Sequence, residues 1–294
     1  MLIRINNDEA ILPFQVSADE PGLRLLDRRG KERWVDVGGL RGLVKASPDG
    51  KLVLHYGRGI SLIDPVHDFA RIDIAEWNGT EPEPRWNMVI GSSVLVDTVS
   101  RHHLSVELDQ TALKLPDPGY SAPIEGTLLP SGDEIAVSIV RCQHIAIYNF
   151  RRRATELVTL AGRWGSAHGN VVDGELWLTN YDTICAMNVE TRRVRASSVL
   201  QPSFPDPQYG LLTSAFVGIP KHVPFLNGWL VPRPYSGDIV LVDKDTMSGT
   251  SRIAMGGRPY DLALFDDGTL LVIDHPFEGP RFEHIQNLMP IRNA

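Results

Sequence analysis

The chain has 294 residues, of which 43% are apolar and 22% charged, and this composition excludes a disordered or collagen-like chain. Its formal net charge of −7, without a block of Lys or Arg, gives nucleic acid no electrostatic surface to bind. There is no apolar run near the roughly 20 residues of a membrane helix and no signal-peptide pattern, and two cysteines cannot form a disulfide framework or a zinc site. We therefore expect a soluble, cytoplasmic protein that has no nucleic-acid or membrane partner.

The same phrase, two alternating apolar runs joined by a turn, recurs along the chain. The turns lie at Asn7-Asp8, Asp49-Gly50, Ser92-Ser93, Ser131-Gly132, Asp173-Gly174, Asn227-Gly228 and Asp267-Gly268. The intervals between them are 41, 43, 40, 41, 55 and 39 residues. Because a four-stranded propeller blade takes about 40–50 residues, this period favours a propeller over other all-β folds.

The second unit shows its strands most clearly. Period-2 alternation between turn residues predicts strands over 40–47, 51–56, 60–63 and 70–75. A second series of turns follows the third strands, at residues 28–30, 64–65, 109–110, 150–152, 190–191 and 244–245. No stretch sustains the helical spacing of apolar residues, although 283–289 fits either a short helix or a strand. A parallel sheet is therefore disfavoured, since it needs crossover helices.

These patterns predict one all-β domain over residues 1–294, a seven-bladed β-propeller of four-stranded antiparallel blades. The last unit is weak after Pro276, so six blades are the alternative, with the ring closed by residues 1–5 pairing with C-terminal strands. The long interval holds a Pro-rich stretch at about 201–225. We expect this stretch to be an ordered surface insertion, because it carries apolar anchors.

Several stretches resemble known propeller repeats. Ser47–Leu54 followed by Gly59–Asp64, and Gly257–Leu264 with its turn at 267–268, resemble the unit of YVTN-type repeats. Residues 167–171 with 176–180 resemble the variant of streptogramin-lyase-like and NHL-type propellers. The resemblance covers about four of the seven units and implies the fold. It implies no single activity, because such propellers include lactonases, lyases, condensing enzymes and pure scaffolds.

The predicted fold brings polar residues to one face, the mouth of a central channel. The loops that enter each first strand and those between the second and third strands emerge there, and they are rich in Arg, His, Tyr and Trp. Convergent polar groups in an apolar-walled depression are typical of a ligand site. The residues predicted to bind the ligand are Arg85, Trp86, Glu125, Trp164, Tyr235, Arg258 and Tyr260. The alternative is that these side chains cap turns and pair between blades.

Three residues are predicted to be catalytic: His168, His275 and Asp261. His168 lies between small neighbours at the start of an inner strand, and His275 follows an aspartate and precedes a proline, which suits both to general acid–base work. Asp261 and Glu125 each lie seven residues before a turn glycine, so a carboxylate pair could bind a divalent cation or transfer protons. The alternatives are structural or solvated histidines, and carboxylates that cap backbone amides between blades.

The function predicted from these residues is small-molecule binding at the channel mouth, with lyase, hydrolase or condensation chemistry. No cofactor is certain, and a divalent cation is the one considered. The alternative is a protein–protein interaction scaffold without catalysis, because Arg and aromatic side chains also dominate protein interfaces. Glycan recognition by exposed Trp and Tyr is a third interpretation. Trp177 and Trp229 are predicted to belong to the core, and Cys185 to be buried.

Overall fold

The computed structural model describes residues 2–12, 22–37, 43–46, 52–56, 59–76, 123–131, 133–139, 144–149, 151–152, 154–160, 170–180, 183–195, 198–199, 218–234, 236–274 and 279–290. The chain divides into two compact units. Unit 1 comprises residues 1, 3–27 and 31–158, and unit 2 comprises residues 2, 28–30 and 159–294.

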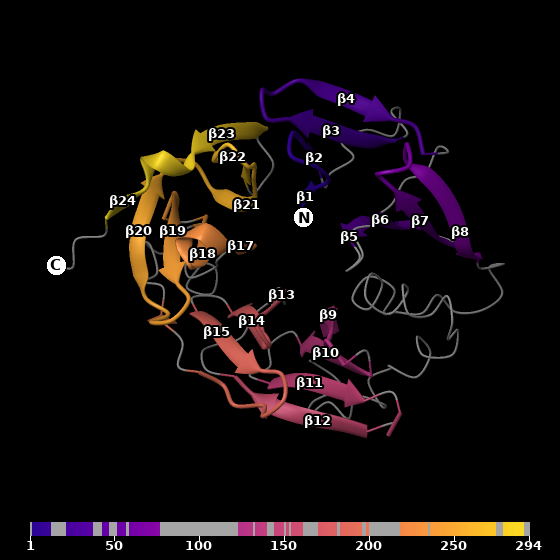
Figure 1. Ribbon diagram of the computed structural model, residues 1–294, viewed down its shortest axis with the longest axis vertical. Coiled ribbons are helices and arrows are strands. Elements are labelled where there is room, and N and C mark those ends of the chain that lie inside the picture. The colour runs from indigo at the N-terminus through magenta and orange to yellow at the C-terminus, as the bar shows by residue number, and fades with distance from the viewer. Residues whose placement is uncertain are drawn as a thin grey trace, which may run out of the picture. The chain divides into compact units, whose positions relative to one another are not determined.

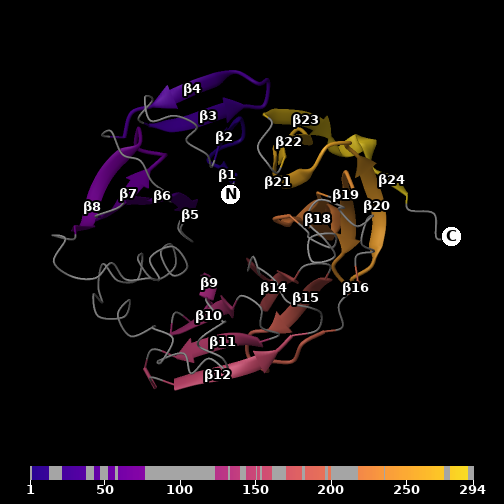
Figure 2. The ribbon, with the colours of Figure 1, turned by 180° about the vertical axis from the view of Figure 1, so that it is seen from behind.

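The described residues of unit 1 form three four-stranded sheets in which each strand pairs with the next along the chain (Figure 1, Figure 2). Sheet A consists of β1 (Ile3–Arg4), β2 (Glu9–Ile11), β3 (Leu23–Asp27) and β4 (Glu32–Val35). Sheet B consists of β5 (Leu43–Ala46), β6 (Leu52–Tyr56), β7 (Gly59–Asp64) and β8 (Ala70–Glu76). Sheet C consists of β9 (Pro123–Leu128), β10 (Glu134–Ile139), β11 (His144–Asn149) and β12 (Ala154–Thr159).

Unit 2 contains three further sheets. Sheet D consists of β13 (Asn170–Val172), β14 (Glu175–Asn180), β15 (Thr183–Asn188) and β16 (Ser198–Val199). Sheet E consists of β17 (Lys221–Val223), β18 (Gly228–Arg233), β19 (Asp238–Asp243), β20 (Gly249–Ala254) and β24 (Met289–Pro290). Sheet F consists of β21 (Pro259–Leu264), β22 (Thr269–Asp274) and β23 (Pro280–His284). Two short 3-10 helices complete the described elements, η1 (Pro224–Leu226) and η2 (Ile285–Asn287).

The strands predicted for the second unit of the sequence are confirmed as β5 to β8. The described ranges contain no α-helix, in agreement with the sequence pattern. The described residues accordingly include no helix long and apolar enough to cross a membrane. The stretch 283–289 contains both the end of β23 and η2. The third predicted unit, around its turn at 92–93, lies outside the described residues, so the number of seven blades stays a prediction.

The ends of the chain pair differently from the six-blade alternative. β1 pairs with β2 of its own sheet, with Ile3 opposite Ile11, rather than with C-terminal strands. β24 pairs with β20, so it extends sheet E and sheet F has three described strands. The weak last unit of the sequence therefore forms a sheet of three described strands, and the described chain after it adds a strand to sheet E.

One local device recurs where third strands end. The last residue of the strand accepts a hydrogen bond from a backbone N–H of the following turn, as Asx residues do in tight turns. The residues that accept this bond, with donor and distance, are Asp27 (Lys31, 2.7 Å), Asp64 (Val66, 3.0 Å), Asn149 (Arg152, 2.8 Å), Asn188 (Thr191, 2.8 Å) and Asp243 (Thr246, 2.8 Å). In sheet F, His284 Nδ1 has the same role and accepts from Gln286 at 3.1 Å. This is the physical reason for the second series of turns.

Apolar side chains pack the sheets of unit 2 against one another. One cluster joins sheets D and E around Trp177 and Trp229, whose ring centroids lie 5.2 Å apart. Another joins sheets E and F and includes Val223, Leu230 and Leu262. Both tryptophans are fully buried, as predicted, and the prediction that Cys185 is buried is also confirmed.

The predicted insertion at about 201–225 overlaps a regular sheet. Residues 221–223 form β17, in which Lys221 pairs with Leu230 and Val223 with Gly228. The insertion therefore does not extend to 225, and residues 201–217 lie outside the described part of the chain. Pro220 and Pro224 flank a strand of three residues, which is too short for its alternation to stand out in the sequence.

Candidate functional site

Most of the predicted site residues lie outside the described residues. These are Arg85, Trp86, Trp164, His168, Tyr235 and His275. Glu125 is described by its place on β9 alone, and its predicted role stays a prediction. The structure brings together Arg258, Tyr260 and Asp261, which lie on β21 or directly before it.

A β-bulge in β21 distinguishes this group. Pro259 pairs with Asp274 and Asp261 with Ile273, so Tyr260 is the extra residue between them. Bulges redirect side chains and are frequent beside active sites. β9 has the same irregularity, because Pro123 pairs with Ile139 and Glu125 with Ser138. Each of these two first strands therefore begins with Pro, one extra residue and an acidic residue, so Asp261 and Glu125 each lie directly after a bulge.

The Asp261 carboxylate is fully buried and surrounded by donors. Its Oδ2 accepts the backbone N–H of Leu2, which belongs to unit 2, and its Oδ1 accepts the N–H of Leu262 at 2.8 Å. Lys221 Nζ lies 3.6 Å from Oδ1 and 3.4 Å from the Leu2 carbonyl oxygen, to which it donates. Asp261 thus holds backbone amides and also faces an ammonium group.

The backbone in front of β17 bridges sheets E and F beside the bulge. Gly218 N–H donates to Pro232 O at 2.8 Å, and Ile219 N–H donates to Tyr260 O at 2.7 Å. A Cβ atom at Gly218 would lie 1.9 Å from Tyr260 O, which no real contact allows. Glycine is therefore the residue that permits this close approach.

Two further buried carboxylates lie at the same end of sheets E and F. Asp238 at the start of β19 pairs with Arg233 at the end of β18, whose Nε donates to Oδ1 at 2.7 Å. Asp274 at the end of β22 accepts from Arg281 Nη2 and, at 3.2 Å, from the N–H of Arg258. We call this part of unit 2 the EF end; it comprises the ends of β18, β20 and β22, the starts of β19, β21 and β23, and residues 218–221.

Among the described side chains, the buried charged groups lie at the EF end. Among the residues whose side chains are described, the buried charged ones are Asp238, Asp261 and Asp274. Each faces a cationic side chain, namely Arg233, Lys221 and Arg281 respectively. Within the described ranges, no three His, Cys, Asp or Glu side chains come together as a metal site would require.

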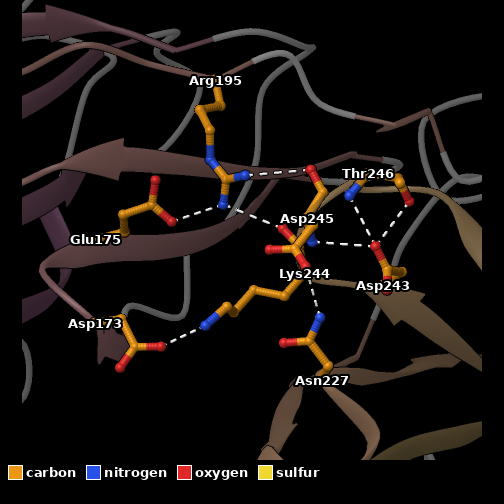
Figure 3. Close-up of polar contacts among 8 residues, drawn as sticks. All are labelled: Asp173, Glu175, Arg195, Asn227, Asp243, Lys244, Asp245 and Thr246. Atoms are coloured by element: carbon orange, nitrogen blue, oxygen red, sulfur yellow. Dashed lines mark hydrogen bonds and ion pairs between the residues drawn. The ribbon is translucent and has the colours of Figure 1, made fainter.

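The opposite ends of the strands, at the turns, carry a polar network between sheets D and E (Figure 3). Lys244 forms an ion pair with Asp173, and Arg195 binds Glu175 at 2.6 Å and the Lys244 carbonyl oxygen at 3.1 Å. Asn227 donates to Asp245 at 2.8 Å. The contact with Lys244 lowers the pKa of Asp173 and raises that of Lys244. Lys244 of this network pairs with a carboxylate across the boundary of the two sheets, and Arg195 binds the Lys244 carbonyl oxygen across the same boundary, so the network serves to join sheets D and E.

A second polar–aromatic contact links this network to the core. Arg195 lies over the Trp177 ring, 5.2 Å from its centroid, and the His222 ring lies tilted by 43° against the Trp229 ring with 5.0 Å between their centroids. Burial lowers the pKa of His222, and the nearby Lys244 acts in the same direction. The sheets of unit 1 use a similar arrangement, in which Arg33 pairs with Glu9 and lies 5.6 Å from the centroid of Phe69.

Lys221 and Arg281 are the residues of the EF end that the sequence interpretation missed. Lys221 was assigned to the insertion, although Lys221-His222-Val223 directly precedes the hairpin turn at Asn227-Gly228, where a first strand is expected. Arg281 lies beyond Pro276, where the repeat is too weak to align. No local pattern could have paired either side chain with its carboxylate, since the partners come from other strands.

No protein-family model matches the chain, and no curated protein sequence does. The extracellular domain of a candidate one-component system from B. thetaiotaomicron superposes with a TM-score of 0.62 at 12% identity, covering 100% of this chain and 41% of that one. This chain thus spans less than half the length of that structure. A candidate 6-phosphogluconolactonase from Bacteroides fragilis superposes with a TM-score of 0.55 at 10% identity, covering 98% and 94% of the two chains.

Virginiamycin B lyase from Staphylococcus aureus also matches over 100% of this chain and 84% of its own, with 12% identity, but its TM-score of 0.45 supports no further argument. Identities of 10–12% show the fold alone. The six sheets and these likenesses together confirm the predicted class: the chain has an all-β fold that resembles β-propeller proteins.

Proposed function

We propose that this chain binds a small molecule at the EF end, the described part of the channel mouth that the sequence predicts. The observation that carries the proposal is the bulge at Tyr260, which lies directly beside the fully buried Asp261. Regular strand pairing needs no bulge. An extra residue at the start of a first strand changes the direction of the side chains beside it.

The buried charges support the same interpretation. Burying an ion pair costs desolvation energy that its attraction often fails to repay, so such pairs contribute little to stability compared with apolar residues. Three buried carboxylates at one end of two sheets are therefore better explained by preorganisation of a polar site. At the turn end of sheets D and E, by contrast, the Asp173 and Glu175 carboxylates remain partly solvated, with 70% and 19% of their side chains exposed.

Within this proposal the residues have distinct roles. Arg258 and Tyr260 contact the ligand, and Asp261 is a positioning residue, because its oxygens accept two backbone N–H groups and face Lys221. His168 and His275 transfer protons if the ligand is a substrate, as general acids and bases do near neutral pH. Among the propeller-like structures compared, a candidate lactonase is an enzyme by name, which is compatible with a reacting ligand.

A thermal-shift screen of metabolites against the full chain tests the proposal. We expect at least one compound to raise the melting temperature of the wild-type protein, and Tyr260→Ala to abolish that rise. Phe225→Ala is the matched control, because Phe225 is an aromatic residue of η1, 69% exposed and at the turn end of sheet E.

Two results would overturn the proposal: no compound stabilises the wild-type chain, or Tyr260→Ala and Phe225→Ala respond to the compound equally. Co-purification of one stoichiometric protein that survives Tyr260→Ala would favour the scaffold instead. For a ligand that reacts, His168→Ala combined with His275→Ala should stop turnover while the melting temperature of the free protein stays nearly unchanged.

A further inference from the structure

We infer that Lys221 binds an oxyanionic group, a carboxylate or a phosphate, of the ligand. This inference rests on the proposed function and adds the charge of the ligand to it. It assigns a ligand-binding role to a residue of β17 whose ammonium faces Asp261 and the Leu2 carbonyl oxygen.

The hydrogen bonds of Lys221 are long. Its Nζ lies 3.4 Å from the Leu2 carbonyl oxygen and 3.6 Å from Asp261 Oδ1, whereas N–H···O bonds in proteins measure about 2.7–3.2 Å. An ammonium group has three donors. With 25% of its side chain exposed, Lys221 can reach a molecule in solvent. Lys244 of the same sheet is different, since its Nζ forms a close ion pair with Asp173.

Asp261 holds Lys221 without a close contact. Each of its two oxygens already accepts one backbone N–H, from Leu2 or from Leu262, and its side chain is fully buried. The carboxylate lies 3.6 Å from the Lys221 Nζ and keeps the ammonium at the EF end while leaving donors of that group available. An ammonium held in place in this way needs less ordering to bind an anion than a mobile surface lysine does.

The remaining described ion pairs of the EF end do not reverse this charge. Asp238 faces Arg233 and, at 3.8 Å, Arg252, while Asp274 faces Arg281. With Lys221 and Asp261 added, four cationic side chains face three carboxylates. The EF end thus has an excess of positive charge among these pairs, in a chain whose net charge is −7.

Calorimetric titration with sodium phosphate and with sodium acetate, against sodium chloride at the same ionic strength, tests the inference. The wild-type protein should bind phosphate or acetate, and Lys221→Gln should weaken that binding about tenfold or more, as the loss of a charge-assisted hydrogen bond does. Lys244→Gln is the matched control and should bind like the wild type. Tighter binding of phosphate would identify a phosphorylated ligand, and tighter binding of acetate a carboxylate.

Two further variants cover the case in which Lys221→Gln does not fold. Lys221→Arg keeps the charge and should retain anion binding, and Lys221→Met removes the charge, keeps the apolar length of the side chain and should fold without binding. The inference is overturned if the wild type binds neither anion, or if the uncharged variants bind like the wild type. If a neutral compound then depends on Tyr260 for binding, the ligand site stands and only its charge was wrong; if nothing binds, both proposals fail.

Discussion

Replacing Asp261 by alanine separates a positioning role from a catalytic one. The substitution removes the acceptor of the Leu2 and Leu262 amides and leaves Lys221 facing no carboxylate at this position. Removing one partner of a buried ion pair costs about 3–5 kcal/mol of unfolding free energy. Lys221 is 25% exposed and recovers part of its hydration, so we expect the lower part of that range, about 3 kcal/mol.

Asp267→Ala provides the matched control in the same sheet. Asp267 is a turn residue with 40% of its side chain exposed, and it accepts one backbone N–H from Thr269 at 2.9 Å and pairs with Arg28. Its loss should cost about 1 kcal/mol, the value typical of one exposed hydrogen-bonded carboxylate. Urea unfolding of the full chain, followed by circular dichroism, measures both variants.

The comparison of the two variants can contradict our reasoning in two ways. If Asp261→Ala unfolds at the same urea concentration as Asp267→Ala, the buried carboxylate does not hold the backbone and our reasoning on the EF end is wrong. If Asp261→Ala instead binds or turns over ligand poorly while its free energy of unfolding is unchanged, Asp261 acts directly on the ligand and the catalytic interpretation from the sequence is right.

Three further predictions concern other parts of unit 2. Gly218→Ala should destabilise the protein by about 3 kcal/mol or more, because its Cβ would lie 1.9 Å from Tyr260 O and force two backbone hydrogen bonds apart. Gly174→Ala is the control and should cost about 1 kcal/mol, since no atom lies within 4 Å of its Cβ position. Equal urea midpoints of the two variants would contradict this prediction. Burial and Lys244 lower the pKa of His222 below its value in the unfolded chain, about 6.5, although Asp173 opposes them. As the pH falls, the unfolded chain therefore takes up the proton before the folded one does. The free energy of unfolding should accordingly decrease as the pH drops below about 6.5. His222→Gln should therefore lose less stability than the wild type between pH 7.5 and 5.5, and an unchanged loss would exclude His222 as its source. Burial raises the pKa of Cys185 to about 12, so mass mapping should show it unalkylated by iodoacetamide at pH 8 in the native protein and alkylated in urea; native alkylation would mean that sheet D opens.

The sequence predicted well those features that depend on a few consecutive residues. β6 and β7 coincide with the alternating runs to within a residue or two, because each alternation reports which side chains face the interior of its own sheet. The turns that follow third strands were found for a similar reason, since a single oxygen from a side chain such as Asp64 or Asp243 holds each one.

The site was harder to predict because its contacts join distant strands. The offset of Asp261 from its turn glycine marked it as unusual, and the structure places Asp261 directly after the bulge at Tyr260. Nothing near Asp261 in the sequence indicates that its cation comes from Lys221, forty positions earlier on another sheet. The prolines around β17 also concealed the strand that carries this lysine. The residues of the predicted loops could indicate a polar end of the sheets, but they could not show which cation pairs with which carboxylate.

The turns after third strands have a consequence for recognising such chains. Aspartate, asparagine and histidine all serve there, since each offers one acceptor at the right distance from the next amide. A blade can thus change its amino-acid identity at this position without changing its shape. Similarity between repeats of this kind is better detected by comparing hydrogen-bond acceptors at this position than by comparing amino-acid identities. An alignment that scores identity alone will overlook it.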